Sequence, residues 1–71
     1  MAPIDAIRNH VRRYRRLREW TQEELGTRVG VTRQTIISIE RGKYNPSVGL
    51  ALKIAAVFGV TVEELFEIEG E

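Results

Sequence analysis

The sequence contains no cysteine, a single histidine and no long apolar run among its 71 residues. Without cysteine there is no disulfide, no thiolate zinc site and no cysteine nucleophile. His10 alone cannot build a histidine metal cluster, and the sequence shows neither a catalytic spacing nor a phosphate-binding loop. No stretch approaches the ~20 apolar residues of a membrane span, and no signal-type segment follows the first residue. We therefore expect one small cytoplasmic domain (1–71) that is not an enzyme and has no cofactor, metal, membrane or small-molecule partner.

Charge is plentiful, and it is distributed unevenly along the chain. Lys, Arg, Asp and Glu make up 30% of the residues, yet the net charge is only +1. Residues 1–43 carry +5, and residues 44–71 carry −4. This asymmetry predicts an anionic partner at one end of the domain and repulsion of that partner at the other. The alternative is that exposed helix faces simply carry charge.

Apolar residues recur at helical spacing along most of the chain, which predicts five short helices. The first helix is expected to begin between residues 4 and 9, and its apolar stripe consists of Ile4, Ile7, Val11, Tyr14 and Leu17. Each later helix follows a Ser or Thr that can cap its first turn, namely Thr21, Thr32, Ser47 and Thr61. Glycines that can end three of them follow at Gly30, Gly42 and Gly59. The expected helices cover about 22–29, about 33–41, Ser47 to about Phe58, and a short segment after Thr61.

Residues 22–41 carry the most informative pattern, two short helices joined by a tight turn. Gly26 supplies the small residue needed where the helices approach each other, and Gly30 tolerates the positive φ of the corner. The apolar residues of this segment are Leu25, Val29, Val31, Ile36 and Ile39. The arrangement is typical of a helix-turn-helix, whose second helix enters the major groove of DNA.

In these residues the sequence resembles the Cro/C1-type (xenobiotic-response-element, lambda-repressor-like) transcription regulators. The matching stretches are Trp20–Leu25, Val29–Ile36, Ile39–Ser47, Leu50–Ala55 and Phe58–Phe66, within about residues 11–67. The resemblance implies an all-α, five-helix lambda-repressor-like fold and a compact regulator that acts as a homodimer on double-stranded DNA. One departure is Gly26, where the family usually has alanine, at a cost of about 1 kcal/mol in helix propensity.

The resemblance also implies roles for individual residues. Four match base-contacting positions: Thr32, Arg33, Gln34 and Ser38. Six are expected at the DNA backbone: Lys43, Tyr44 and Asn45 by this match, Thr21 and Gln22 at the start of a helix, and Thr35. The Thr35 hydroxyl suits a phosphate, and its methyl group suits a thymine methyl as the alternative. Arg15 and Glu40 match a pair that forms an internal salt bridge.

Elementary chemistry supports these roles and leaves alternatives open. Arginine can bind guanine through two parallel hydrogen bonds, and glutamine suits adenine. The alternative is that Arg33 and Gln34 are only solvated surface. For Tyr44, the alternative to a phosphate contact is that its ring packs against Pro46. Three arginines of the first helix either add diffuse attraction for DNA or form a solvated face, namely Arg8, Arg12 and Arg16.

One recognition helix reads only ~4–5 base pairs, so two copies about one DNA turn (~34 Å) apart on a palindromic operator are expected. The candidate dimerisation segment is about 57–69, with Phe58, Val60, Phe66 and Ile68 at the interface. Apolar and acidic residues alternate at its end, which predicts a short strand after the fifth helix. Its partner would lie around residues 7–11, giving a small two-stranded β-ribbon from the chain termini. That conflicts with the helical stripe there, so residues 1–10 stay open between helix, strand and disorder.

The leading hypothesis is a sequence-specific DNA-binding transcriptional regulator, a repressor that occludes a promoter. The alternative is an antitoxin-type or protein-interaction module that autoregulates its operon with a partner protein. RNA binding is disfavoured because the expected fold has no exposed aromatic sheet platform.

Overall fold

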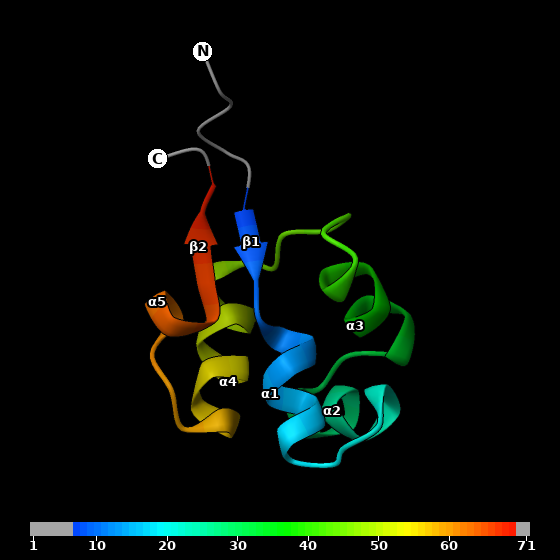
Figure 1. The fold of residues 1–71 in the computed structure, drawn as a ribbon. Coiled ribbons are helices and arrows are strands. Elements are labelled where there is room, and N and C mark those ends of the chain that lie inside the picture. The colour runs from blue at the N-terminus through cyan, green and yellow to red at the C-terminus, as the bar shows by residue number, and fades with distance from the viewer. Residues whose placement is uncertain (1–6, 70–71) are drawn as a thin grey trace.

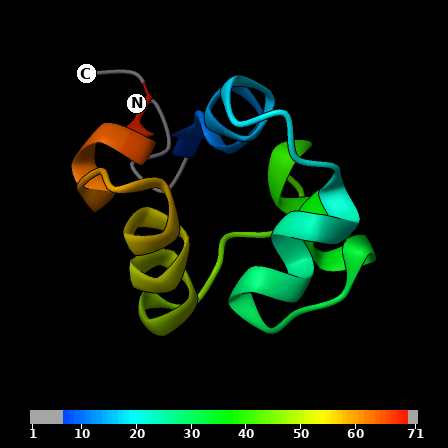
Figure 2. The same cartoon turned by 90° about the horizontal axis from the view of Figure 1, so that it is seen from below.

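The computed structural model describes residues 7–69, which form five helices and a two-stranded antiparallel sheet (Figure 1). In chain order the elements are β1 (Ile7–Asn9), α1 (Val11–Leu17), α2 (Gln22–Val29), α3 (Arg33–Glu40), α4 (Val48–Phe58), α5 (Val62–Leu65) and β2 (Phe66–Ile68). Seen from below, α4 and α5 lie on one side of the molecule, and α2 and α3 lie on the other (Figure 2). The fold class expected from the sequence, five helices with a small ribbon, is confirmed.

The core is one cluster of apolar side chains to which all five helices contribute. Its fully buried large members are Val11, Leu25, Ile36, Ile39, Ile54, Phe58 and Leu65. The rings of Tyr14 and Trp20 pack against Phe58, with centroid distances of 5.7 and 5.8 Å. Burying one apolar side chain of this size stabilises a fold by roughly 1.5–3 kcal/mol. Since Ile36 and Ile39 belong to this cluster, the core itself holds α3 in place.

The helices begin at the capping residues expected from the sequence. The Thr21 hydroxyl accepts the Glu24 amide at 3.0 Å, and the Glu24 carboxylate accepts the Thr21 amide at 2.7 Å. Thr61 and Glu64 form the same reciprocal box at the start of α5, at 3.0 and 2.9 Å. Gly30 ends α2 at φ 80°, a left-handed conformation that favours glycine. The predicted bounds of α2 and the predicted end of α4 are confirmed, and α3 ends one residue earlier than expected.

The first helix begins later than the apolar spacing predicts. α1 starts at Val11, and residues 7–9 form β1, which pairs with β2. Leu17 was expected in the buried stripe but is 67% exposed, and Ile4 lies outside the described residues. The predicted start between residues 4 and 9 is therefore wrong. Cross-strand hydrogen bonds satisfy the backbone of this segment in place of a helical turn.

The β-ribbon joins the two ends of the described chain. β1 and β2 are antiparallel, with Ile7 opposite Ile68, so the predicted strand after the fifth helix is confirmed. Asn9 then connects the ribbon to the helices. Its side-chain amide donates to the Ile39 carbonyl at 2.8 Å, and its side-chain oxygen accepts the Val11 amide at 3.2 Å. The ribbon is thus bonded both to the start of α1 and to the last turn of α3.

Gly26 lies where α2 meets the turn that leads into α3. A Cβ atom at this position would lie 2.6 Å from the Val31 carbonyl oxygen, closer than Cβ contacts in proteins come. The Gly26 carbonyl also accepts the Val31 amide at 2.9 Å. The absence of a side chain therefore permits the close approach that sets the geometry between the two helices.

Candidate nucleic-acid interface

The second helix of the motif, α3, has one buried and one exposed face. Ile36 and Ile39 are completely buried, whereas Arg33 and Gln34 in its first turn are exposed. Ser38, one turn further along, is half-buried. The helix therefore presents hydrogen-bonding side chains outward from a fixed apolar base.

The Thr32 side chain already serves as the N-terminal cap of α3. Its hydroxyl accepts the Thr35 amide at 3.3 Å and lies 3.2 Å from the Thr35 hydroxyl. A hydroxyl has one donor and two acceptor sites, so Thr32 keeps some capacity for a further hydrogen bond. The cap also orders the first turn, where Arg33 and Gln34 lie.

A shallow hollow beside α3 brings together residues from both predicted DNA-contacting sets. It is lined by Thr32, Gln34, Thr35, Ser38 and Tyr44. Three of these were expected at bases and two at the backbone. Arg33 is exposed outside this hollow.

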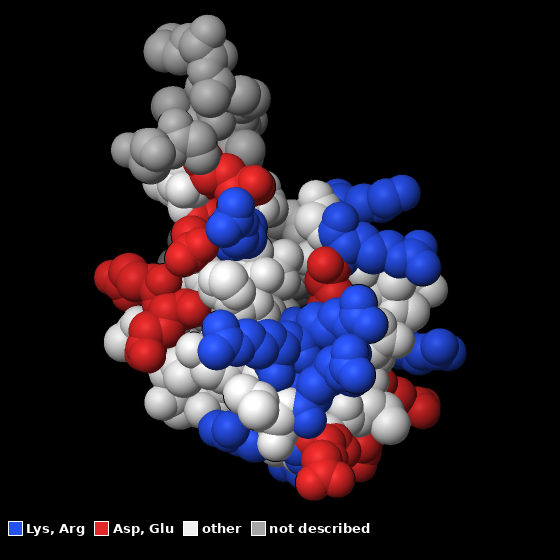
Figure 3. Space-filling model, in the orientation of Figure 1, with Lys and Arg blue, Asp and Glu red and all other residues white. Residues whose placement is uncertain are grey.

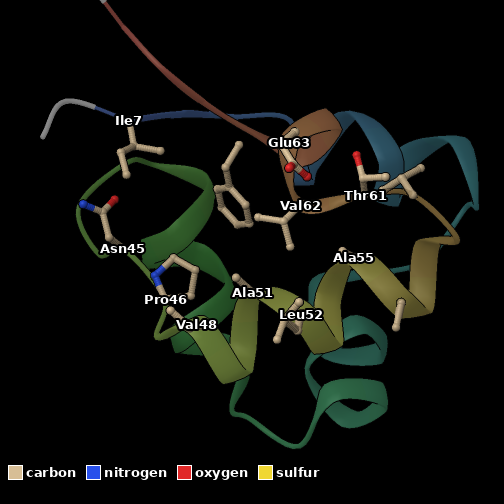
Figure 4. Close-up of a pocket in the computed structure, with 13 residues that line it drawn as sticks. Ile7, Asn45, Pro46, Val48, Ala51, Leu52, Ala55, Thr61, Val62 and Glu63 are labelled. Carbon is tan, nitrogen blue, oxygen red and sulfur yellow. The ribbon is translucent and has the colours of Figure 1, made fainter. Parts of the chain in front are cut away.

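The loop after α3 divides its three predicted contact residues between two surfaces. Lys43 and Tyr44 are exposed, and Tyr44 lies with the α3 side chains. Asn45 lines a different, largely apolar hollow together with Pro46 (Figure 4). Tyr44 thus lines the hollow beside α3, and Pro46 lines the other one.

A second polar hollow lies between α1, the start of α2 and the end of α3. Its lining residues are Arg12, Arg15, Thr21, Gln22, Ile37, Glu40 and Arg41. Arg15 and Glu40 form the ion pair expected from the sequence, with Nε–Oε2 at 2.7 Å and Nη2–Oε1 at 3.2 Å. Their side chains are only 13% and 5% exposed. Gln22 adds a hydrogen bond of 3.2 Å from its side-chain amide to the Glu40 carboxylate.

These bonds tie three helices together. Arg15 also donates to the Trp20 carbonyl at 2.8 Å, so one guanidinium joins α1 to the residue before the α2 cap and, through Glu40, to α3. A shielded pair of this kind is costly to break, which holds α3 at a fixed angle to α1. Because the hydrogen bond to Glu40 uses one N–H of the Gln22 side-chain amide, a second side-chain N–H and the backbone amide are left as donors for a phosphate.

The start of α2 offers that amide to an anion. First-turn amides have no acceptor within their own helix, and the capping box occupies those of Thr21 and Glu24. The Gln22 amide remains at the positive end of the helix dipole, where anions are favoured. Arg12 and Arg41 line the same hollow. Two cationic side chains therefore lie beside the positive end of α2.

Glu24 stays ionised within this capping box. The backbone amide of Thr21, and then its hydroxyl, hold the pKa of the Glu24 carboxyl below its ordinary value of 4.5. Arg28 lowers this pKa further by its charge. The box is thus built on a carboxylate at neutral pH.

The four predicted dimerisation residues do not share one surface. Phe58 is 1% exposed and lies in the core of the single chain, so its placement at a dimer interface is wrong. Val60 and Phe66 line the apolar hollow of Figure 4, which runs over α4 and α5. Ile68 is exposed on β2. Phe58 was misplaced because an apolar residue in a core and one at an interface look alike in a single sequence.

Two residues of α4 that had no predicted role line the same hollow. Val48 and Leu52 are 77% and 56% exposed. They lie four residues apart, off the buried stripe that contains Ile54 and Phe58. That spacing was the available signal, since it places them on one helix face. An exposed apolar face of this kind is typical of protein contact.

Charge is separated in space as well as along the chain. Figure 3 shows Lys and Arg side chains gathered over α1 and on the α3 side of the same face, and Asp and Glu gathered over α5 and β2. Within the acidic region, Glu67 and Glu69 lie 3.9 and 3.7 Å from the Arg8 guanidinium. The basic surface therefore adjoins the recognition helix.

In the described part of the chain, residues 7–69, no helix is long and apolar enough to cross a membrane. Nor do three or more His, Asp or Glu side chains gather there in a way that could hold a metal ion.

Comparison with known proteins identifies the motif. A family model described as helix-turn-helix matches residues 11–65. An uncharacterized HTH-type transcriptional regulator of Methanocaldococcus jannaschii, MJ0272, is 51% identical over 65 residues, covering 92% of this chain and 98% of the relative. The chain belongs to the Cro/C1-type helix-turn-helix family. The regulator YgzD of Bacillus subtilis is 46% identical over 92% of this chain and 98% of its own length.

A solved structure supports the fold of this helix-turn-helix chain. The crystal structure of the hypothetical transcription factor NHTF from Neisseria superposes with a TM-score of 0.75 at 30% identity, covering 84% of this chain and 69% of that one. Family membership identifies α2, the turn and α3 as a DNA-binding unit. The relatives are named transcriptional regulators, which points to a role other than enzyme catalysis.

Proposed function

We propose that this helix-turn-helix protein is a homodimeric transcriptional repressor that acts in the cytoplasm and binds a palindromic operator through the major groove. The observation that carries the proposal is the two-faced α3. Ile36 and Ile39 anchor the helix at 0% exposure, while Arg33 and Gln34 are exposed in its first turn. An α-helix with side chains is about 10–12 Å across and fits a major groove about 12 Å wide.

Each polar side chain of α3 has a chemical match on a base edge. Arg33 would donate two hydrogen bonds to guanine O6 and N7, and Gln34 would pair with adenine N6 and N7. The Ser38 hydroxyl can donate a hydrogen bond to a base or accept one from it, and the Thr32 methyl group suits a thymine methyl. The hollow that Thr32, Gln34 and Ser38 share keeps these groups within reach of neighbouring base pairs.

Phosphates would be held on both sides of the recognition helix. At the start of α2 the groups are Thr21 and the Gln22 amide, next to Arg12 and Arg41. At and after α3 they are Thr35, Lys43, Tyr44 and Asn45. Such contacts set register and affinity without reading sequence.

A second copy of this chain would cover the apolar surface of α4, α5 and β2. This α4–α5 surface consists of Val48, Leu52, Val60 and Phe66. It also includes the exposed Ile68, which lies opposite Ile7 of the same hollow in the β-ribbon. A two-fold dimer joined there would present two copies of α3 to successive turns of one duplex face, ~34 Å apart. Bound across a promoter, the dimer would repress by occlusion.

Selection of binding sites from a pool of random duplexes tests the proposal. We expect a palindromic consensus whose half-sites lie about one helical turn apart, bound by a dimer in analytical ultracentrifugation. Fluorescence anisotropy should show affinity falling steeply with salt. A selected pool without a consensus, or a single half-site bound by one protomer, would contradict the proposal. A reporter gene placed behind the selected site should lose expression when the protein is present, and a gain would contradict repression.

A further inference from the structure

The arginines in and around α1 divide into engaged and unengaged side chains. Arg8 faces Glu67 and Glu69 at 3.9 and 3.7 Å. Arg15 is bound to Glu40. Arg18 donates to the backbone carbonyl of Phe58. Each of these three arginines is therefore accounted for by a contact within the fold.

Three further arginines have no such contact within the part of the chain that the structure describes. Arg12, Arg13 and Arg16 are all exposed, and among residues 7–69 none of them has a carboxylate within 4.0 Å. They line one hollow with Asn9, His10, Leu17 and Glu40. We call Arg12, Arg13 and Arg16 the arginine strip. The carboxylate that lines this hollow, Glu40, is already bound by Arg15 and Gln22.

The arginine strip costs stability unless something neutralises it. Arg12 and Arg16 are spaced i,i+4 and Arg13 and Arg16 i,i+3, so like charges meet on one helix face. A fold that needed only solvated charge could mix both signs there. Three clustered cations on one face instead suit an extended anion.

The strip is continuous with the proposed DNA surface. Arg12 lines its hollow and also the hollow that holds Thr21, Gln22 and Arg41. Figure 3 shows basic side chains over α1 and, past an acidic group, on the α3 side of the same face. From Arg12 to Arg16 the helix rises about 6 Å, while the phosphates of one strand recur about every 3.4 Å along the axis of the duplex, so the strip is long enough to face more than one phosphate. A polyanion held at the α2 start could therefore continue along α1.

We infer that the arginine strip binds phosphates of duplex DNA flanking each half-site, outside the base pairs that α3 reads. This inference rests on the proposed function. It assigns Arg12, Arg13 and Arg16 to affinity and to the length of duplex covered, and not to the choice of sequence. The protein would thus prefer an operator embedded in longer DNA to the same operator cut at its edges.

The test compares two double variants with equal loss of charge. Arg13→Gln/Arg16→Gln removes two cations of the strip. Arg8→Gln/Lys53→Gln removes two cations elsewhere, from β1 and from α4. Each is measured by fluorescence anisotropy across a salt series on the selected operator duplex, made once without flanks and once with about 10 extra base pairs on each side.

On the flanked duplex, we expect the strip variant to lose about 0.9 in the slope of log affinity against log salt for each phosphate contact removed, or about 1.8 per protomer and about 3.6 for the bound dimer. The control variant should keep the wild-type slope. On the duplex without flanks, the two variants should agree. Repeated selection with the strip variant should return the wild-type consensus.

Equal slopes for strip variant and control on the flanked duplex would overturn the inference while leaving the α3 assignment standing. A wild-type chain that selects no consensus would instead remove the proposed function, and with it the flanking site. Thermal melts check that the variant folds. We expect no loss of stability, because Arg13 and Arg16 are exposed and glutamine suits a helix. The charge-preserving variant Arg13→Lys/Arg16→Lys should restore the slope, and a slope that stayed low would show that packing rather than charge was lost.

Discussion

Arg15 and Glu40 are 25 residues apart in the chain and meet through two parallel hydrogen bonds of 2.7 and 3.2 Å. The guanidinium belongs to α1 and the carboxylate to the last residue of α3. One ion pair therefore connects the basic helix to the recognition helix, and a bidentate contact fixes orientation as well as distance. The angle at which α3 leaves the core depends on this contact in addition to Ile36 and Ile39.

Replacing Arg15 by alanine should destabilise the fold by roughly 3–5 kcal/mol, because the shielded Glu40 carboxylate would lose its cation. The matched control is Arg16→Ala, one residue along the same helix, where an exposed side chain without a carboxylate partner among residues 7–69 should cost within about 0.5 kcal/mol. Urea denaturation of both variants measures the difference. Equal losses would show that the ion pair does not hold the helices together.

Arg33→Ala and Gln34→Ala should each weaken operator binding by about 1–3 kcal/mol and relax the preference at one base pair. Lys43→Ala is the comparison, because a phosphate contact carries no sequence information. It should weaken binding equally on all duplexes and flatten the salt dependence by about one unit for each protomer bound. Anisotropy titrations against single-base variants of the operator distinguish the two classes. Full discrimination in both α3 variants would refute their assignment to bases.

Glycine at two helix positions should respond differently to a methyl group. At Gly49 in α4, an added Cβ would lie 4.0 Å from its nearest neighbour, the Ser47 hydroxyl oxygen, so Gly49→Ala should stabilise the fold by about 0.5–1 kcal/mol through helix propensity. Gly26→Ala gains a similar propensity but brings its Cβ within 2.6 Å of the Val31 carbonyl oxygen. We expect its melting temperature to fall below that of Gly49→Ala. Equal gains would mean that the turn before α3 relaxes without cost.

The helices that the sequence predicted well are those with local signals. The Thr21 and Thr61 caps lie three residues from the glutamates that complete them, so each box is visible within four residues. β1 has no such signal, because it is defined by hydrogen bonds to β2 at the other end of the chain. Ile7 and Val11 are spaced as a helix would space them, and only the long-range pairing decides for a strand.

The residues of the candidate site likewise divide into those that a local sequence signal places and those that only long-range contacts place. Arg33 and Gln34 follow a capping threonine and precede a buried isoleucine, so a short motif places them on the exposed face. The hydrogen bond from Gln22 to Glu40 joins residues 18 apart in the chain, and nothing local indicates it. The misplacement of Phe58 has a related cause, since the rings that bury it belong to Tyr14 and Trp20 far along the chain.

Leu52→Glu should dissociate the proposed dimer, because it puts a charge on the exposed apolar α4–α5 surface. The control is Lys53→Glu, an exposed neighbour on the same helix that does not line the hollow. Sedimentation equilibrium should show the first variant monomeric at concentrations where the second remains dimeric. Unchanged association of Leu52→Glu would place the dimer contact elsewhere.

Acid should weaken the start of α2 through Glu24. Hydrogen bonds from Thr21 hold the pKa of this carboxyl below its ordinary value of 4.5. A carboxyl whose pKa is lower in the folded state than in the unfolded state stabilises the fold fully above the unfolded pKa, and loses that contribution as the pH falls through the folded pKa. Glu24→Gln keeps an oxygen that accepts the Thr21 amide and does not titrate, so its melting temperature should fall less than that of the wild type between pH 6 and about pH 3. Glu23→Gln, which removes a carboxylate from the same turn but none from the capping box, should retain the wild-type acid sensitivity. If the two variants lost stability in parallel on acidification, protonation of the Glu24 carboxylate would not be the cause of the acid sensitivity.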